Sequence, residues 1–321
     1  MTTLVALQRC PDYSPAIVER ALRAALDDLG GMASLLGDAE RVLVKPNLLM
    51  ANSPEKGWTT HPAVVDATLK LIREAGDREI TLGDSPAMGS AQRVAKRCGI
   101  GEVAARHGVP VLNLSQPVRA PLPPEAEWTH LLVDRRVIAT GTRVVNVAKV
   151  KVHCQMYLTL AIKNLFGVTP GKRKPAWHIS VDADRLRFGR MLIWLHRVVA
   201  PAVNIIDGVD AMERRGPRGG DMRRIGMLAA SPDAVALDRV VTEVLGLDPS
   251  KHHALQSAAS LEHGAWSMEQ IDVRGAAIEE LRVRDFKEAP VANLGFSVPR
   301  PARSLIRQVF LRSFPQHVRS Q

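Results

Sequence analysis

Short β-branched runs alternate with amphipathic segments along this chain, and this alternation limits the folds that it can adopt. The runs that read as strands in the first half are 3–7, 41–45, 79–83 and 109–114. The segments that read as helices between them are 14–29, 62–75, 92–98 and 102–106. Strands separated by helices at this spacing are typical of βαβ units, which build a mostly parallel sheet with flanking helices. The sequence therefore predicts an α/β fold.

The second half continues in the same style with different loops. Its predicted strands are 144–147, 203–206 and 227–230, and its predicted helices are 157–165, 185–199 and 233–245. The proline-rich segment 117–124 is predicted to be a surface excursion. We expect two α/β lobes over 1–135 and 136–290, or one elaborated sheet, followed by a basic amphipathic tail over 291–321.

Polar residues follow several of the predicted strands directly. Lys45, Pro46 and Asn47 follow the strand that begins at 41, Asp84 ends the strand that begins at 79, and Asp207 follows the strand at 203–206. The carboxyl ends of parallel strands are where open α/β sheets bind ligands. A single charged residue at such a place also serves as a turn or helix cap. Their recurrence predicts a site at the carboxyl ends of the strands.

Lys149, Lys151 and His153 alternate just past the predicted strand at 144–147. Period-two spacing puts all three side chains on one face of an extended chain. Cationic groups on one face repel one another unless an anion or a metal lies between them. The alternative is a solvent-facing edge strand, in which lysines discourage aggregation.

Two further segments carry candidate residues. Thr60 and His61 precede Pro62 at the start of a predicted helix, where free N–H groups can hold a carboxylate or phosphate, although Thr60 could simply cap the helix. Glu213 precedes a loop rich in arginine and glycine, and it could act as an acid, a base or a metal ligand. The alternative for this loop is a flexible surface segment, because it lacks the spacing of a nucleotide-binding motif.

The composition points to an anionic partner. The chain has 43 Lys and Arg against 33 Asp and Glu, which gives a formal net charge of +10. Such a balance favours a carboxylated or phosphorylated metabolite, nucleic acid or a membrane surface. An aromatic content of 4% weighs against binding of single-stranded nucleic acid by base stacking.

The three cysteines, Cys10, Cys98 and Cys154, form no C-x-x-C pair. No intrinsic iron–sulfur cluster is expected, and a reducing cytoplasm is the simplest compartment. No apolar run approaches the length of a membrane span. The region from Pro299 to Gln321 contains five arginines and no acidic residue. Its spacing suits a basic helix that packs on the body of the protein or contacts an anionic membrane, nucleic acid or an acidic partner.

Six separated motifs, taken together, resemble the family named domain of unknown function 362. The match covers about Arg41 to Gly246. The motifs occur in one order: Val44-Lys45-Pro46-Asn47-Leu48; Thr60-His61-Pro62; Gly83-Asp84-Ser85; Lys149-x-Lys151-x-His153; Lys163-Asn164-Leu165-Phe166-Gly167; and Asp207-Gly208 with Met212-Glu213 and Gly216-Pro217.

The resemblance also implies a redox alternative. Many members of this family carry a ferredoxin-like segment with two cysteine-ligated clusters, and this chain lacks the cysteines for them. It also has Arg214 where the family motif tends to have glycine. A role here would then depend on a partner's cluster, such as that of an acidic ferredoxin.

A looser similarity links the central segment to the nickel-pincer lactate racemases. The similar residues are His153, Lys163, Gly167, Pro170-Gly171 and His178. This similarity implies that His153 and His178 lie near a reacting carbon as proton-transfer groups or metal ligands. A divalent metal held by both histidines and a carboxylate is one option, although no dense metal-binding motif is present.

The sequence favours an enzyme that acts on an anionic small molecule by acid–base or metal-assisted chemistry. A lysine crowded by other cations has a lowered pKa and can act as a base or a Schiff-base nucleophile. The alternatives are a ferredoxin-coupled reductase and a basic nucleic-acid-binding protein. The expected catalytic residues are His153, Lys151, Glu213 and Asp84. The expected substrate-binding residues are Lys45, Asn47, Thr60, His61, Lys149, Lys163, Asn164 and Asp207.

Overall fold

The structure is a computed structural model that describes residues 2–171, 177, 181 and 184–291. His178 and the basic tail from 292 onward lie outside the described residues, so the expectations for them stay untested. No helix in the described part of the chain is long and apolar enough to span a membrane.

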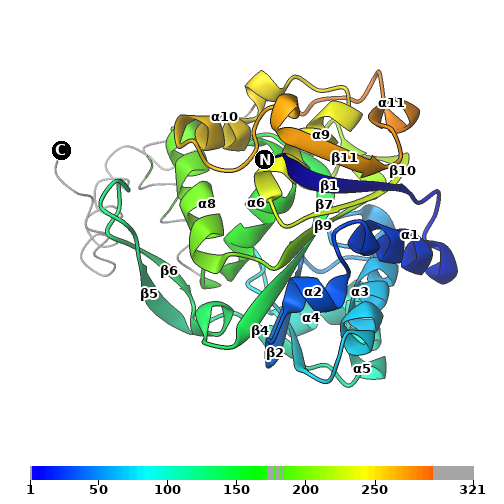
Figure 1. Cartoon of the computed structure of the whole chain (residues 1–321), viewed down its shortest axis with the longest axis vertical. Helices are drawn as coiled ribbons and strands as arrows, with labels where there is room; N and C mark the ends of the chain where they lie inside the picture. Colours follow the sequence, from blue (N-terminus) through cyan, green and yellow to red (C-terminus); the bar gives the residue numbers. More distant parts are fainter. Residues whose placement is uncertain (1, 172–176, 178–180, 182–183, 292–321) are drawn as a thin grey trace.

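A nine-stranded sheet forms the centre of the described protein (Figure 1). Its order is β11 (Ile271–Gly275), β1 (Thr3–Arg9), β10 (Asp221–Ser231), β9 (Val203–Glu213), β7 (Thr142–His153), β2 (Arg41–Pro46), β3 (Glu79–Asp84) and β4 (Val111–Asn113), with β8 (Tyr157–Thr159) beside the end of β7. The pairs from β9 to β4 are parallel, whereas β10 is antiparallel to both of its neighbours. The predicted α/β fold with a mostly parallel sheet is confirmed.

The sheet is continuous across the expected border between 135 and 136. Strand β2 of the first segment pairs with β7 of the second, from Arg41 opposite Thr142 to Pro46 opposite Val147. Strand β1 at the start of the chain pairs with β10 and β11 near the end of the described residues. The two segments therefore share one elaborated sheet, which is the second of the two expected arrangements.

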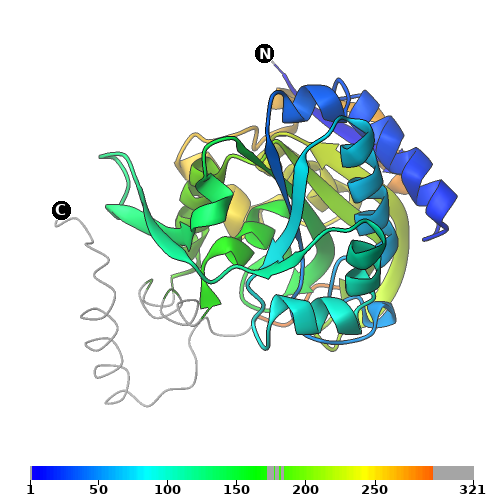
Figure 2. The same cartoon turned by 90° about the horizontal axis from the view of Figure 1, so that it is seen from below.

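Helices cover both faces of this sheet. One face carries α1 (Pro15–Asp27), α2 (Met32–Leu36), α3 (Pro62–Glu74), α4 (Ala91–Arg97) and α5 (Ile100–Arg106). Figure 2 shows these blue and cyan helices gathered on one side of the sheet. The other face carries α6 (Ala161–Asn164), α8 (Arg185–Val199), α9 (Ala234–Val244), α10 (His253–Ser260) and α11 (Ile278–Leu281). Within β7, Val145 and Val147 belong to the first core while Val144 and Ala148 belong to the second, as alternation along a strand requires.

The proline-rich segment forms part of a small hairpin. Strand β5 (Pro117–Pro121) pairs antiparallel with β6 (His130–Asp134). The hairpin projects from the body beside α8 (Figure 1). The predicted excursion is present, and it is a paired strand instead of an irregular loop.

The helix predicted over 157–165 is wrong in its first part. Residues Tyr157–Thr159 form β8, which folds back onto the end of β7, and α6 begins only at Ala161. The reason is a tertiary contact, because the Asp238 carboxylate on α9 accepts hydrogen bonds from the Ala161 and Ile162 amides at 2.8 and 3.2 Å. A carboxylate supplied from about 77 positions away fixes the start of this helix.

The strand order places a topological switch between β2 and β7. From β2 the chain proceeds outward to β3 and β4, and it then returns to lay β7 on the opposite side of β2. In open α/β sheets a crevice forms beyond the carboxyl ends of the strands at such a point. The ends of β2, β3 and β7 carry the predicted polar residues, so the fold brings these residues to one place.

Candidate functional site

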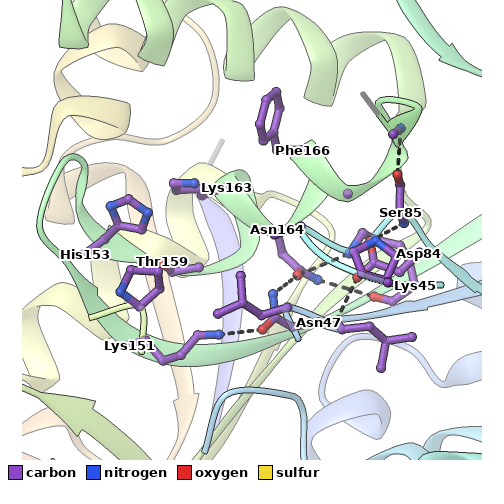
Figure 3. A pocket seen from close by; sticks show the side chains of 18 residues that line it. Lys45, Asn47, Asp84, Ser85, Lys151, His153, Thr159, Lys163, Asn164 and Phe166 are labelled. Carbon is purple, nitrogen blue, oxygen red and sulfur yellow. Dashed lines mark hydrogen bonds and ion pairs between the residues drawn. The ribbon is translucent and has the colours of Figure 1, made fainter. Parts of the chain in front are cut away.

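A cavity of about 670 Å³ lies at this switch point. It is formed by the ends of β2, β3 and β7, by β8 and by the segment around α6 (Figure 3). The predicted site residues that line it are Lys45, Asn47, Asp84, Lys151, His153, Lys163 and Asn164. Those that the structure places outside its lining are Thr60, His61, Lys149, Asp207 and Glu213.

The alternative of an exposed edge strand is wrong for the lysine and histidine cluster. Strand β7 lies inside the sheet, between β2 and β9. Lys149 and Lys151 are 1% and 0% exposed. Both lysines were expected just past a short strand, whereas β7 continues to His153. The strand extends further because the polar side chains find partners inside the protein.

Lys45 and Asp84 form a buried ion pair at one end of the cavity. The Lys45 Nζ lies 3.2 Å from an Asp84 oxygen and donates to the Pro46 carbonyl at 2.7 Å and to Asn164 Oδ1 at 3.3 Å. Burial lowers the pKa of Lys45, and the Asp84 carboxylate opposes that effect. All three hydrogens of this ammonium are therefore used within the protein.

Gly167 makes room for this ion pair. A Cβ at this position would lie 2.0 Å from Asp84 Oδ1 and 2.4 Å from Lys45 Cε. The Gly167 carbonyl also accepts a hydrogen bond from the Ser85 amide at 2.9 Å. The glycine that ends the Lys163 to Gly167 motif is thus required by close approach of the ion pair.

A chain of buried amides holds Asn47 in one orientation. Asn47 Nδ2 donates to Asn164 Oδ1 at 3.0 Å, and Asn164 Nδ2 donates to Asn146 Oδ1 at 2.8 Å. Asn146 Nδ2 then donates to Asn204 Oδ1 at 2.8 Å, and Asn204 Nδ2 donates to the Pro232 carbonyl at 3.0 Å. Because each amide donates in the same direction, the Asn47 Oδ1 atom is left as an acceptor facing Lys151.

Lys151 is buried without a carboxylate partner among the described residues. Its Nζ donates to Asn47 Oδ1 at 2.5 Å and to the Trp58 carbonyl at 2.7 Å. Burial lowers the pKa of Lys151 well below its usual range, and the nearby ammonium groups of Lys149, Lys163 and Lys45 lower it further. The environment therefore favours the neutral amine.

Lys163 lies on the α6 side of the same cavity. Its Nζ sits over the rings of Phe166 and Phe188, at 5.7 and 5.9 Å from their centroids. No hydrogen bond or ion pair joins this Nζ to another described residue, so its three hydrogens are available to a ligand. Burial lowers the pKa of Lys163 to about 8.

His153 and Thr159 complete this end of the cavity (Figure 3). His153 Nδ1 accepts hydrogen bonds from the backbone amides of Gln155 and Met156 at 3.1 and 3.3 Å. A neutral imidazole that accepts at Nδ1 carries its hydrogen on Nε2, which is then a donor. The buried Thr159 hydroxyl has no hydrogen-bond partner within the described part of the chain.

The described residues contain no group of three or more His, Cys, Asp or Glu side chains that could hold a metal ion. Ligation through His153 Nε2 would require the ring to place its hydrogen on Nδ1 and to lose both backbone hydrogen bonds. The proposed second ligand, His178, lies outside the described residues. The two backbone hydrogen bonds thus place the His153 hydrogen on Nε2 when the ring is neutral.

Lys149 and Asp207 form a second buried pair that also fixes the start of α3. Lys149 Nζ donates to Asp207 Oδ1 at 2.9 Å and to the Tyr13 hydroxyl at 2.6 Å. The other Asp207 oxygen accepts from the His61 amide at 2.9 Å, and the Tyr13 ring stacks on the His61 ring at 3.5 Å. Desolvation lowers the pKa of His61. Lys149 is thus neutralised by its own carboxylate, in contrast to Lys151.

An Asp207→Ala protein should lose about 3–5 kcal/mol of unfolding free energy, because Lys149 would stay buried without its counter-charge. Urea unfolding monitored by circular dichroism measures the change. Glu280→Ala is the control, since it breaks the solvent-exposed pair with Arg9, in which the side chains are 50% and 60% exposed. This control should change stability little. Equal, small losses in both variants would contradict the structural role of Asp207.

Thr60 and Glu213 also have structural contacts. The Thr60 hydroxyl accepts from the Asn47 amide at 2.8 Å and donates to the Val147 carbonyl at 2.8 Å. Glu213 accepts from the Lys287 amide at 3.0 Å. Thr60 thus holds the backbone of Asn47, which lines the cavity, against β7. Glu213 fixes the end of β9 to the segment at Lys287, outside the cavity lining.

Sequence patterns missed several contributors to the site. Thr159 lies in the segment that was expected to be helical, so the sequence gave no reason to place its hydroxyl in the cavity. Trp58 contributes only its backbone carbonyl, which a side-chain pattern cannot indicate. Tyr13 and Phe166 are common core residue types, and only their partners distinguish them. Phe166 did fall within a motif already singled out.

The family model described as Domain of unknown function (DUF362) matches residues 42–243. A thylakoid-associated protein of Synechocystis sp. is 36% identical over 313 residues, which cover 97% of this chain and 96% of the relative. The chain belongs to the DUF362 family. This confirms the membership that the six motifs predicted.

Two solved structures show a more distant likeness. The lactate racemase apoprotein from Thermoanaerobacterium thermosaccharolyticum is 12% identical with a TM-score of 0.47, covering 71% of this chain and 54% of that chain. A protein from Thermotoga maritima is 13% identical with a TM-score of 0.40, covering 66% of this chain and 55% of that one. The chain matches little more than half of each of these solved chains.

Proposed function

We propose that this protein is an enzyme that binds a small carboxylate- or phosphate-bearing molecule in the cavity and acts on it by acid–base chemistry. The observation that carries the proposal is the pairing pattern of the cavity lysines. Lys45 has the Asp84 carboxylate, whereas Lys151 and Lys163 have no carboxylate partner among the described residues.

An anion would offset the electrostatic cost of burying the Lys163 ammonium, which is charged at neutral pH. Opposite charges 4 Å apart attract by about 4 kcal/mol in surroundings of intermediate polarity. The lysines are enclosed in a cavity instead of being spread over a surface, which favours a small molecule over nucleic acid. A volume of about 670 Å³ lies in the range of small-molecule sites.

The donors at one end of the cavity would hold the acid group. Lys163 offers three hydrogens and Thr159 offers a hydroxyl, and His153 lies beside them in the cavity lining. Lys151, with both of its neutral-amine hydrogens on Asn47 and Trp58, would present its lone pair as the base. Phe166 covers part of the cavity wall and would limit access of water.

Anion affinity should fall as the pH rises through about 8, because Lys163 loses its proton there and a neutral amine no longer attracts an anion. Below that pH the Lys163 contribution should be constant. Isothermal titration calorimetry with acetate, glycolate and phosphate measures the affinity at pH values from about 6.5 to about 9.5. This range spans about three pH units around the lowered pKa of Lys163.

Lys163→Arg is the matched control for this profile. Arginine keeps its charge throughout the range, so the decline near pH 8 should disappear in this variant. A wild-type affinity that is constant from below to above pH 8, or the absence of any anion binding, would contradict the proposal.

A further inference from the structure

We infer that Lys151 forms an imine with the carbonyl carbon of a small 2-oxo acid whose acid group is held at Lys163. This inference rests on the proposed anion site and names its substrate class. It is carried by the positions of the acceptors around Lys151 and of the donors across the cavity.

The two acceptors near Lys151 match a neutral amine. A neutral amine has two hydrogens and one lone pair, and the acceptors are Asn47 Oδ1 at 2.5 Å and the Trp58 carbonyl at 2.7 Å. With both hydrogens taken, the remaining tetrahedral position carries the lone pair. An ammonium would instead bury a third N–H without a partner among the described residues, which is unfavourable.

Burial and most of the surrounding charges act in the same direction. Lys149, Lys163 and Lys45 disfavour a proton on Lys151, and Asp84 opposes them only as the last-ranked cause. Asp84 is already paired with Lys45, and Asp207 is paired with Lys149. Neighbouring cations and an apolar surrounding are the conditions under which a lysine becomes a nucleophile toward carbonyl compounds.

Lys163 supplies hydrogen-bond donors for a carboxylate and for a carbonyl oxygen on the adjacent carbon. Its three hydrogens have no acceptor among the described residues, so one ammonium can contact a carboxylate and the neighbouring carbonyl oxygen together. With a pKa of about 8 it is also a proton donor suited to neutral pH. In a 2-oxo acid the carboxylate and the carbonyl group lie on adjacent carbons, so both can contact the same ammonium.

Imine formation would pass protons between Lys151, the substrate oxygen and Lys163. The Lys151 lone pair forms a bond to the carbonyl carbon, and the carbonyl oxygen takes a proton from Lys163. The nitrogen, now positively charged, returns a proton to Lys163. Lys163 then protonates the hydroxyl group, which leaves as water with its bonding electrons, and the iminium forms. One proton is consumed overall, and the iminium keeps one N–H for Asn47 Oδ1.

Reductive trapping tests the inference on the unmodified protein. The protein is incubated with pyruvate and sodium cyanoborohydride, whose hydride reduces an imine to a stable secondary amine, and the modified lysine is located by peptide mass mapping. We expect stoichiometric modification of Lys151, and Lys70 serves as the internal control because its side chain is 49% exposed. Lys151→Arg should lose the adduct, and folding of this variant is checked by circular dichroism.

Binding of glycolate, which has the acid group but no carbonyl, separates the two proposals. An adduct at Lys151 that glycolate suppresses supports the inference. Glycolate binding without any adduct, or with adducts only on exposed lysines such as Lys70, overturns the imine but leaves the anion site. If glycolate does not bind and no adduct forms, both the anion site and the imine are overturned.

Discussion

A Gly167→Ala protein is expected to lose about 3 kcal/mol or more of unfolding free energy and at least about thirtyfold in anion affinity. The added methyl would lie 2.0 Å from Asp84 Oδ1, 2.4 Å from Lys45 Cε and 2.5 Å from Lys45 Nζ. Each of these separations is shorter than any non-bonded contact that carbon tolerates.

The buried ion pair cannot yield without further losses. Asp84 also accepts the Leu48 and Ser85 amides at 2.7 Å, so moving its carboxylate breaks two more hydrogen bonds. Moving Lys45 breaks its contact with Asn164, which orients Asn47 and thereby Lys151. One methyl group therefore disturbs both the fold and the reactive end of the cavity.

Urea unfolding and calorimetric anion titration measure both effects. Gly108→Ala is the control, because nothing lies within 4 Å of its added methyl and its backbone φ of +64° adds only a conformational cost. That cost is about 1 kcal/mol, with anion affinity unchanged. If Gly167→Ala behaved like this control, the close approach of Gly167 to the ion pair would be refuted.

Lys163→Met should change stability and binding in opposite directions. We expect a loss of about a hundredfold or more in anion affinity, because a charged donor contributes about 1.5–3 kcal/mol to a hydrogen bond. We expect a gain of about 1–3 kcal/mol in unfolding free energy at pH 7, because each unit of lowered pKa corresponds to about 1.4 kcal/mol. Methionine fills the same space beside Phe166 and Phe188 without a charge.

The pH dependence of this stability gain fixes its origin. Lys163 has a pKa of about 8 in the folded protein, against about 10.4 for an ordinary lysine. The cost of burying its charge is therefore fully present below pH 8 and disappears as the pH rises to about 10.5. The advantage of the methionine variant should shrink over that window in denaturant unfolding experiments.

Lys70→Met provides the comparison, since Lys70 is exposed and pairs with Glu19 at 2.7 Å. This variant should change neither stability nor anion affinity appreciably. The expectation would be contradicted by a Lys163→Met protein that is less stable than wild type at pH 7 and binds anions with wild-type affinity. Lys163 would then contribute to packing and not to ligand binding.

The sequence was sufficient to predict the fold class because strand and helix alternation is a local pattern. It also located two of the strand ends that line the cavity, since Lys45 and Asp84 lie at recognisable boundaries, whereas Lys151 lies inside β7, which extends beyond the predicted strand. Strand order was not predictable in this way. It depends on pairing between distant segments, such as β2 with β7, and that pairing decides whether the expected lobes share a sheet.

The different roles of Lys149 and Lys151 mark the limit of the sequence reading. Both belong to the same alternating pattern, yet register places Asp207 opposite Lys149, whereas no carboxylate of the described residues pairs with Lys151. The acceptors of Lys151 come from Asn47 and from a backbone carbonyl of Trp58. Neither the register nor the direction of the amide chain is encoded in a local pattern.

A crystal structure with bound 5-bromo-2-furoate at pH 7 would test the anion site most directly, because this aromatic carboxylate does not alkylate amines and its bromine can be located by anomalous scattering. We expect a carboxylate within hydrogen-bond distance of Lys163 Nζ and the Thr159 hydroxyl, and we expect it to be absent from Lys163→Met crystals prepared in the same way. An empty cavity with the anion bound elsewhere on the surface would contradict the central claim.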